Sequence, residues 1–139
     1  MNPREKLLSI QREKSARFKY DRKPLARRTE TDLKHAIETV LQARGYWCWV
    51  INCGEIRGTF GHVRLMPPGA GDIMGILPGG RAWFIECKKP GEAQNKNEID
   101  WQHTCKLNGT PYCVCETIDE AAQFLTHINC AKDSHCENS

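Results

Sequence analysis

Residues 72–88 read DIMGILPGGRAWFIECK, and this stretch decides the fold. Two apolar runs of strand length, 72–77 and 81–88, flank the turn-forming tripeptide Pro78-Gly79-Gly80. Apolar runs separated by a short glycine-containing turn are typical of a β-hairpin. The sequence therefore predicts two adjacent antiparallel strands here.

The charged residues of this hairpin share one face if its turn has three residues. Alternation along a strand puts Glu86 and Lys88 on the face opposite to Ile85 and Cys87. A three-residue turn then sets Asp72 directly across from Glu86, with Cβ atoms about 4.5–5.5 Å apart. Carboxylates this close repel each other unless they share a proton or a cation, and Lys88 offsets only part of their charge. Magnesium, which binds one or two carboxylates and keeps waters, fits this position, whereas a turn of two or four residues would put the two acids on opposite faces.

The sequence on either side of the hairpin predicts an α/β domain. Thr29, with Asp32 three residues on, opens a helix that runs to about Arg44 and is closed by Gly45. Its apolar stripe consists of Leu33, Ile37, Val40 and Leu41. The other elements are expected in this order: a strand at 46–51, loops with one irregular strand (His62–Met66) over 52–71, a helix at 98–108, a strand at 112–115, and a last helix from the Thr117–Glu120 capping box to about Ile128.

A third carboxylate is suggested by the geometry of the first helix. Stepping about 100° per residue, Glu30 falls about 50° from the centre of the apolar stripe and Glu38 about 130° from it. Glu30 is therefore expected to face inward, and Glu38 to be an ordinary solvated residue. A second interpretation of Glu30 is favourable placement near the positive N-terminus of the helix.

Length and composition restrict the class of protein. A chain of 139 residues allows one domain with one core and is too short for two. Hydrophobic residues make up 40% and charged residues 27%, as in ordinary soluble proteins. No run approaches the roughly 18 apolar residues of a membrane span, and the N-terminus has no apolar stretch of signal-peptide length. We therefore expect a cytoplasmic protein that makes no use of a membrane.

Eight cysteines could suggest a disulfide scaffold. Without a secretory signal, however, disulfides are not expected to persist. Cys113 and Cys115 alternate with apolar residues, and Cys48 and Cys87 lie within apolar runs, so we interpret them as buried thiols. A metal site in the tail is a weaker alternative, because regular ligand spacing is missing from its candidates His127, Cys130, His135 and Cys136.

Charge is distributed unevenly along the chain. Residues 1–28 hold ten Lys and Arg against three acids, a net +7, and the remaining residues balance this to the overall +3. A basic segment on a mildly acidic body favours a polyanion partner, because lysine and arginine displace the counterions of phosphates. Two other interpretations stay open: a merely solvated tail, and a segment that docks through its apolar residues Leu7, Leu8, Ile10 and Phe18.

The order and spacing of several residues resemble a known nuclease superfamily. Gly71-Asp72, Glu86-Cys87-Lys88 and then Gln102 are similar to the PD-(D/E)xK nucleases, and most of all to their virus-type replication-repair nuclease (VRR-NUC) domain. The likeness covers about residues 29–127 and includes Glu30 at the start of a helix. A bare Glu-x-Lys pair is a weak signal, but this ordered set is more specific. One departure is Gly71, which stands where the superfamily pattern has proline.

The resemblance implies a restriction-endonuclease-like core, an α/β fold whose mixed β-sheet is flanked by helices. It also implies a metal site. Asp72 and Glu86 would hold Mg²⁺, for which Mn²⁺ can substitute, together with the backbone carbonyl of Cys87. Glu30 would complete the site directly or through water.

The other implied roles concern water and phosphate. Lys88 would orient or help deprotonate the attacking water and steady the charge that develops on the phosphate. Gln102 would position Lys88 or the water. Arg57, Arg64 and Lys89 are candidate nucleic-acid contacts, although each by itself is more typical of plain surface.

The resemblance implies a metal-dependent endodeoxyribonuclease acting on branched or structured intermediates of replication, recombination or repair, in a phage or prophage setting. The expected organisation is a basic arm (1–28), a nuclease domain (29–128) and a loosely ordered tail (129–139). Symmetric cleavage of a junction would require a homodimer. Two alternatives remain: a nucleic-acid-binding module without catalysis, and a phosphodiesterase directed at RNA or a small molecule. The intact set of Asp72, Glu86 and Lys88 disfavours the first.

Overall fold

The computed structural model describes residues 1–136. Its elements, in chain order, are α1 (Pro3–Asp21), the 3-10 turn η1 (Leu25–Arg27), α2 (Glu30–Ala43), β1 (Trp47–Val50), β2 (Glu55–Gly58), β3 (Gly61–Arg64), β4 (Ile73–Ile76), β5 (Ala82–Cys87), α3 (Lys96–Leu107), β6 (Tyr112–Cys115) and α4 (Ile118–Cys136).

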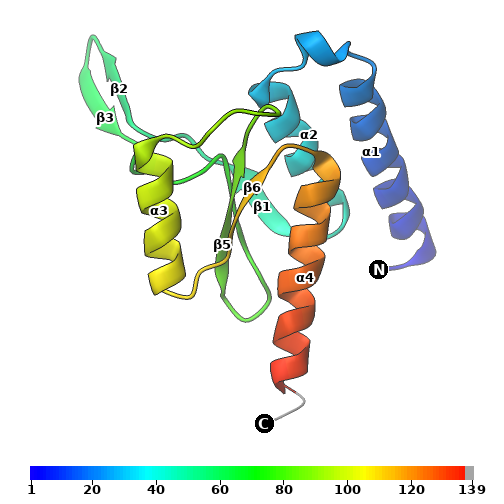
Figure 1. Ribbon diagram of the computed structural model, residues 1–139. Helices are drawn as coiled ribbons and strands as arrows, with labels where there is room; N and C mark the ends of the chain where they lie inside the picture. Colours follow the sequence, from blue (N-terminus) through cyan, green and yellow to red (C-terminus); the bar gives the residue numbers. More distant parts are fainter. Residues whose placement is uncertain (137–139) are drawn as a thin grey trace.

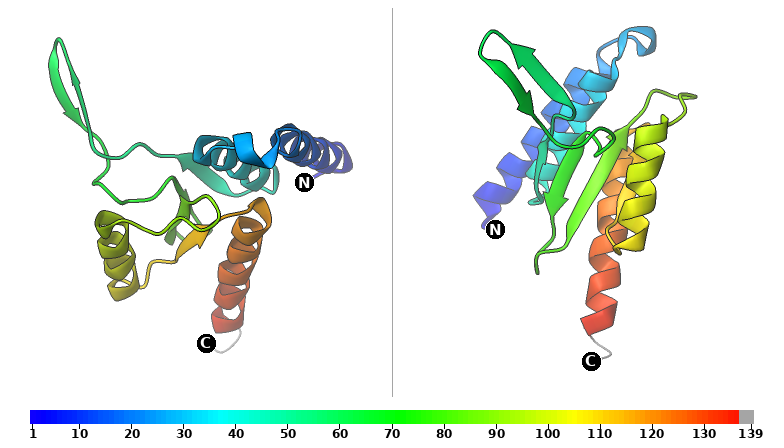
Figure 2. Two further views of the ribbon diagram at one scale, coloured as in Figure 1. Left: turned by 45° about the horizontal axis from the view of Figure 1, so that its top comes forward. Right: turned by 90° about the vertical axis from the view of Figure 1, so that its left-hand side faces the viewer.

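A mixed four-stranded sheet lies at the centre of the fold. Its strand order is β1-β4-β5-β6, with antiparallel pairs except for the parallel pair β5–β6. Helices α2 and α4 cover one face, α3 lies on the other, and α1 packs outside α2 (Figures 1 and 2). This confirms the prediction of an α/β protein with a mixed sheet flanked by helices.

The central hairpin has the register that a three-residue turn requires. Ile73 pairs with Ile85 across β4 and β5. At the turn, the Leu77 N–H donates to the Arg81 carbonyl at 2.8 Å. Continued one residue past the Ile73–Ile85 pair, this register brings Asp72 next to Glu86, and the two side chains interact.

The face of the sheet toward α2 and α4 carries the larger core. Thr29 and Asp32 form the predicted capping box of α2, and the whole predicted apolar stripe of that helix is at most 2% exposed. Trp83, which is fully buried on β5, lies across from Gly75 on β4. A Cβ at position 75 would come within 2.1 Å of the Trp83 ring, so only glycine leaves room for the indole.

Glu38 on α2 does not behave as the helical projection predicted. Its Oε2 accepts a hydrogen bond of 2.6 Å from the Val50 N–H, and its side chain is only 23% exposed. The reason is that β1 is an edge strand, so every second N–H points away from the sheet and needs another acceptor. The projection considered only the apolar face of α2 and missed this contact with the sheet edge.

The segment 52–71 and the start of α3 differ from the sequence predictions. The segment 52–71 holds two paired strands, β2 and β3, instead of one irregular strand. All of their residues are exposed, so no buried pattern marked them in the sequence. Helix α3 begins two residues earlier than predicted, because Asn95 forms a capping box with Glu98.

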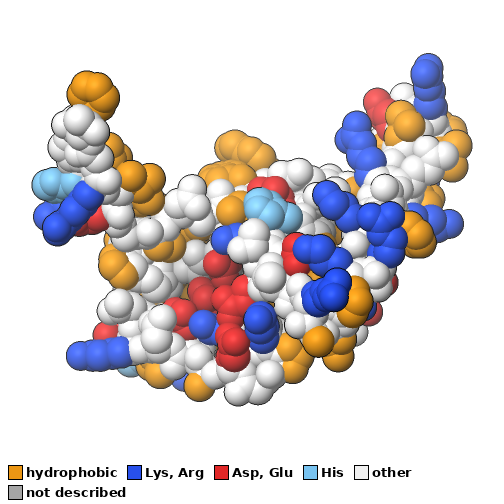
Figure 3. All heavy atoms as spheres, turned by 90° about the horizontal axis from the view of Figure 1, so that it is seen from above, with side chains coloured by type: hydrophobic (Ala, Val, Ile, Leu, Met, Phe, Trp, Pro, Cys, Tyr) orange, Lys and Arg blue, Asp and Glu red, His pale blue; other side chains and the backbone are white. Residues whose placement is uncertain are grey.

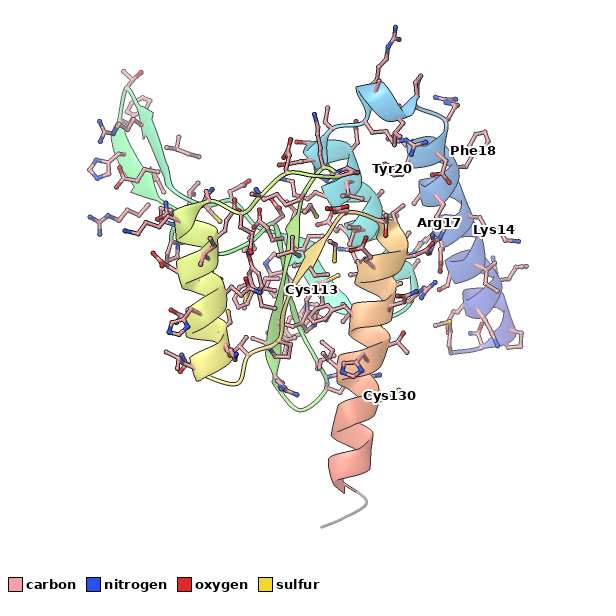
Figure 4. The ribbon with its side chains drawn as sticks, viewed as in Figure 1. Lys14, Arg17, Phe18, Tyr20, Cys113 and Cys130 are labelled. Carbon is pink, nitrogen blue, oxygen red and sulfur yellow. The ribbon has the colours of Figure 1, made fainter. Side chains whose placement is uncertain are left out.

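The basic N-terminal segment is a helix docked on the body. Glu13 pairs with Arg44 of α2 at 2.7 Å, and Arg17 pairs with Asp119 of α4 at 2.9 Å. Tyr20 packs against the core, whereas Phe18 points away into solvent (Figure 4). The segment is therefore docked, but not through the apolar residues that the sequence suggested, because Leu7, Leu8, Ile10 and Phe18 are all exposed. Most of its lysines and arginines remain exposed as well.

The C-terminal helix is longer than predicted. α4 continues past Ile128 to Cys136, so much of the expected loose tail is helical. Residues 137–139, and the side chains of His135 and Cys136, lie outside the described part. Among the described residues no three His, Cys, Asp or Glu side chains are already arranged as a metal site, in the tail or elsewhere.

Six cysteines are free thiols: Cys48, Cys53, Cys87, Cys105, Cys113 and Cys115. Cys48, Cys87 and Cys115 are buried, as predicted, whereas Cys113 is only partly buried; Cys105 is buried as well. No helix within the described residues is both long and apolar enough to cross a membrane.

The contact between Gly75 and Trp83 can be tested by substitution. Gly75→Ala should lower the free energy of unfolding by about 1–3 kcal/mol, because the added methyl group overpacks a closed core. Gly58→Ala is the matched control, since a Cβ at that strand glycine meets nothing within 4 Å. Urea denaturation measures both variants. Equal unfolding midpoints for the two would show that Trp83 does not pack over Gly75.

Candidate metal centre

Helices α2 and α3 begin at the same end of the sheet (Figure 1), and several acidic side chains interact there. Viewed onto this end, they line a hollow between the projecting β2–β3 hairpin and the side of the molecule that carries α1 (Figure 3). Mutual electrostatic interactions link the carboxylates in two overlapping sets: Glu30 with Asp72 and Glu92, and Glu86 with Asp72 and Glu98. The positive N-termini of the two helices partly offset this negative charge.

Asp72 is fixed by hydrogen bonds just before β4. Its N–H donates to the Ile85 carbonyl at 2.8 Å. Its Oδ2 accepts the Cys87 N–H at 2.8 Å, and its Oδ1 lies 3.7 Å from Lys34 Nζ. One carboxylate oxygen is thus held by the backbone of β5, while the other already lies near a cation.

Glu86 is the most perturbed acid of the cluster. Its side chain points to the face opposite the larger core and is 6% exposed. Burial, followed by the negative charges of Asp72 and Glu98, raises the pKa of Glu86 to about 8, with Lys88 acting in the opposite direction. At neutral pH and without another cation, Glu86 therefore holds a proton beside Asp72.

Glu30 faces the cluster, as the helical projection predicted. Burial and a hydrogen bond with Glu92 raise the pKa of Glu30, and Lys88 works to lower it. Glu92 lies in the loop after β5 and was not identified from the sequence, because no regular element constrains its position.

Lys88 is a buried ammonium held between two acidic side chains, those of Glu98 and Glu86. Its Nζ lies 2.9 Å from Glu98 Oε1 and 3.8 Å from Glu86 Oε1, and the residue is 8% exposed. Burial works to lower the pKa of Lys88, but the hydrogen bond and charge of Glu98 outweigh it, so the pKa is raised. Of the two roles that the resemblance implies, stabilising negative charge suits such a lysine, whereas accepting a proton from water does not.

The residue that holds Lys88 is Glu98, and the role of Gln102 toward Lys88 or the attacking water stays a prediction. Gln102 is exposed, one turn further along α3. Glu98 accepts from Lys88 and also from the side chain and backbone N–H groups of Asn95 at 2.8 and 3.1 Å. Because α3 begins at Lys96, two residues before the predicted start, the capping residue Glu98 lies at the end of the sheet. The Asn95-x-x-Glu98 pattern could have indicated this residue.

Lys34 is a second cation that the sequence interpretation missed. It lies one turn after Glu30 on α2, so the two side chains share a face of the helix. Its approach to Asp72 puts a positive charge beside the carboxylate pair.

The three predicted nucleic-acid contacts do not cluster in one place. Lys89 is exposed and lines a cavity of about 560 Å³ that also borders Glu30 and Lys88. Arg57 and Arg64 lie on the β2–β3 hairpin, with side chains 85% and 84% exposed. They therefore belong to a different part of the surface from Lys89.

The glycine before Asp72 has a conformational reason. Gly71 has φ of +101°, and a Cβ there would lie 3.1 Å from the Ile85 carbonyl oxygen. Proline fixes φ near about −65° and cannot adopt this conformation. The backbone conformation at position 71 therefore explains why glycine stands there and excludes proline.

The residues at the sheet end fit a hard divalent cation. Asp72 and Glu86 offer carboxylate oxygens on one face of the sheet. Asp72 already lies near the ammonium group of Lys34, and the raised pKa of Glu86 favours its protonated form. No ready-made cage of three acidic, cysteine or histidine side chains exists in the described chain. Magnesium does not need one, because it is usually bound through one or two carboxylates and retains waters.

Comparison with known proteins gives no match. No family model matches the chain, and neither a curated protein nor a solved structure is significantly similar to it.

The raised pKa of Glu86 predicts how stability depends on pH. The unfolded state loses this proton near pH 4.5 and the folded state near pH 8, so the folded state binds more protons in between. In chelator, the free energy of unfolding should therefore fall as pH rises from about 4.5 to about 8. Glu86→Gln should remove this decline and make the protein more stable than the wild type at pH 8.

Urea denaturation across this pH range, in chelator, measures the effect. Asp100→Asn, at an exposed acid on α3, is the control and should behave as the wild type. A Glu86→Gln protein that loses stability with rising pH as the wild type does would contradict the shared-proton description of the site.

Proposed function

We propose that this protein is a magnesium-dependent nuclease that hydrolyses phosphodiester bonds in DNA, with a VRR-NUC-like site on a restriction-endonuclease-like core. One observation carries the proposal. Asp72 and Glu86 face each other at the end of the central hairpin, and Lys88 lies beside them, held by Glu98. Two crowded carboxylates with a fixed ammonium are the parts that metal-assisted phosphodiester hydrolysis needs.

The remaining architecture supports the same proposal. The hairpin β4–β5 carries the acids, the parallel strand β6 follows it, and the N-terminus of α2 adds Glu30 at the same end of the sheet. A mixed sheet flanked by helices, with these acids at one end, supports the assignment to a PD-(D/E)xK core.

Each residue then has a chemical task. Asp72 and Glu86 would hold Mg²⁺, with Glu30 and the Cys87 carbonyl as further oxygen donors, and the ion would lower the pKa of a bound water and neutralise phosphate charge. Lys88, fixed by Glu98, would stabilise negative charge that develops on the phosphate oxygens. The Cys87 N–H orients Asp72 for this purpose.

DNA as the substrate is supported by the distribution of charge. The hollow with the acids lies between the hairpin with Arg57 and Arg64 and the side of the molecule that carries the basic helix α1 (Figure 3). Basic groups on both sides of a metal site suit a long polyanion, whose phosphates they contact while one linkage reaches the metal.

Charge-neutralising variants test the assignment of the site. Asp72→Asn keeps an acceptor for the Cys87 N–H but removes a ligand charge, and it should lower the cleavage rate by about 100-fold or more. Lys88→Met combined with Glu98→Gln removes the ammonium without leaving its buried partner charged, and it should have an effect of similar size. Cleavage of labelled branched and duplex DNA measures the rates, and Lys106→Ala, at the exposed end of α3, is the control. A folded variant that keeps more than about a tenth of the wild-type rate would show that its residue has no catalytic role.

Metal substitution tests the cofactor. Cleavage should require Mg²⁺ or Mn²⁺ and disappear in EDTA. Ca²⁺ should support DNA binding without efficient cutting, because its looser coordination places the attacking water poorly. Undiminished cleavage in chelator would refute the mechanism.

A further inference from the structure

The β2–β3 hairpin projects from the body beside the metal centre (Figures 1 and 2). It forms a two-stranded sheet of its own that does not pair with the central sheet. Its base is fixed, since the Gly54 N–H donates to the Met66 carbonyl at 2.8 Å and the Leu65 N–H to the Gly54 carbonyl at 2.9 Å. The Cys53 thiol donates to the Gly71 carbonyl at 3.3 Å, so this base lies next to the residue preceding Asp72.

The side chains of the hairpin divide into two faces. Ile56 pairs across the strands with Val63, and Arg57 pairs with His62 on the opposite face. The apolar pair is 58% and 61% exposed. The tip carries Phe60, which is fully exposed. Because Phe60 is fully exposed at the tip of the hairpin, its ring contributes nothing to the hydrophobic core.

The basic groups of the hairpin are available to a ligand. Arg57 and Arg64 both approach the single carboxylate of Glu55, at 3.8 and 3.7 Å. Such long contacts between exposed groups are weak, and one carboxylate cannot neutralise two guanidinium groups. The polar face therefore presents excess positive charge behind the aromatic tip.

We propose that the β2–β3 hairpin is a wedge for branched or frayed DNA, in which Phe60 stacks on a base where two strands separate while Arg57 and Arg64 contact the phosphates beside it. A two-stranded ribbon has the width of a DNA groove. Apolar side chains at such tips enter base steps, and unpaired bases stack on aromatic rings. The proposal rests on the proposed function, and it names the substrate class: DNA with unpaired bases next to the linkage that reaches Asp72 and Glu86.

Binding without cleavage tests the wedge separately from the nuclease. The full chain is titrated in EDTA against a forked DNA and a fully paired duplex of the same sequence, and fluorescence anisotropy is recorded. Phe60→Ala should weaken binding to the fork about tenfold or more, since a base stacked on an aromatic ring contributes roughly that factor, and should change duplex binding little. Phe60→Trp should keep fork binding. Phe18→Ala is the matched control, because Phe18 is an exposed phenylalanine on α1.

A second readout reports the stacking itself. A 2-aminopurine placed at the fork should change its fluorescence on binding the wild type and Phe60→Trp, but not Phe60→Ala. Fork binding that is equal for wild type, Phe60→Ala and Phe18→Ala would overturn the proposal. So would unchanged DNA affinity accompanied by loss of a dimer in light scattering, which would make the hairpin an interface between two copies of the chain. A wedge that binds forks in a protein unable to cleave with Mg²⁺ would refute the proposed nuclease function alone.

Discussion

The opposition of Asp72 and Glu86 across the central hairpin is the constraint on which the rest of the site depends. A three-residue turn puts both acids on the face away from the larger core, where hydrogen bonds from and to β5 hold Asp72 in place. The repulsion between these two largely buried carboxylates must be offset by a proton or a cation. Without a metal, Glu86 keeps a proton and Lys34 approaches Asp72.

The start of α3 is linked to the same site through Glu98. Glu98 caps the helix and holds Lys88, so one side chain stabilises a helix terminus and places a buried ammonium beside the carboxylates. Burying three carboxyl and ammonium groups together is unfavourable unless each has a partner. In this fold Glu98 is the partner that Lys88 has at hydrogen-bond distance, which couples the start of α3 to the chemistry of the site.

Much of this arrangement could be predicted from the sequence, because it follows from local rules. The turn set the hairpin register, the Thr29 capping box set the start of α2, and alternation set the faces of Glu86 and Cys87. The features that the sequence did not predict share one cause, because they depend on contacts between elements that are distant in the sequence. The bond from Val50 to Glu38 depends on which strand lies at the sheet edge, and the approach of Glu92 to Glu30 depends on a loop. Neither contact has a periodic signal in the sequence.

Glu98 and the exposed hairpin illustrate two other limits. The capping pattern of Asn95 and Glu98 is present in the sequence, whereas the family resemblance implied a role for Gln102. Strands β2 and β3 are exposed on both faces, so the hydrophobic alternation that identifies a half-buried strand was missing. Such an exposed two-stranded ribbon is identified only by the backbone pairing of its strands in the structure.

Calorimetric titration with Mn²⁺ is the measurement that tests the central claim most directly, because a metal bound by Asp72 and Glu86 must displace the proton of Glu86. With a pKa of about 8 for Glu86, binding at about pH 7 should release close to one proton per ion, and binding at about pH 9.5 almost none. The heat measured in two buffers of different ionisation enthalpy gives this number. Asp72→Asn should weaken the binding strongly. Mn²⁺ that fails to bind the wild-type protein, or that binds at pH 7 without releasing a proton, would contradict the account.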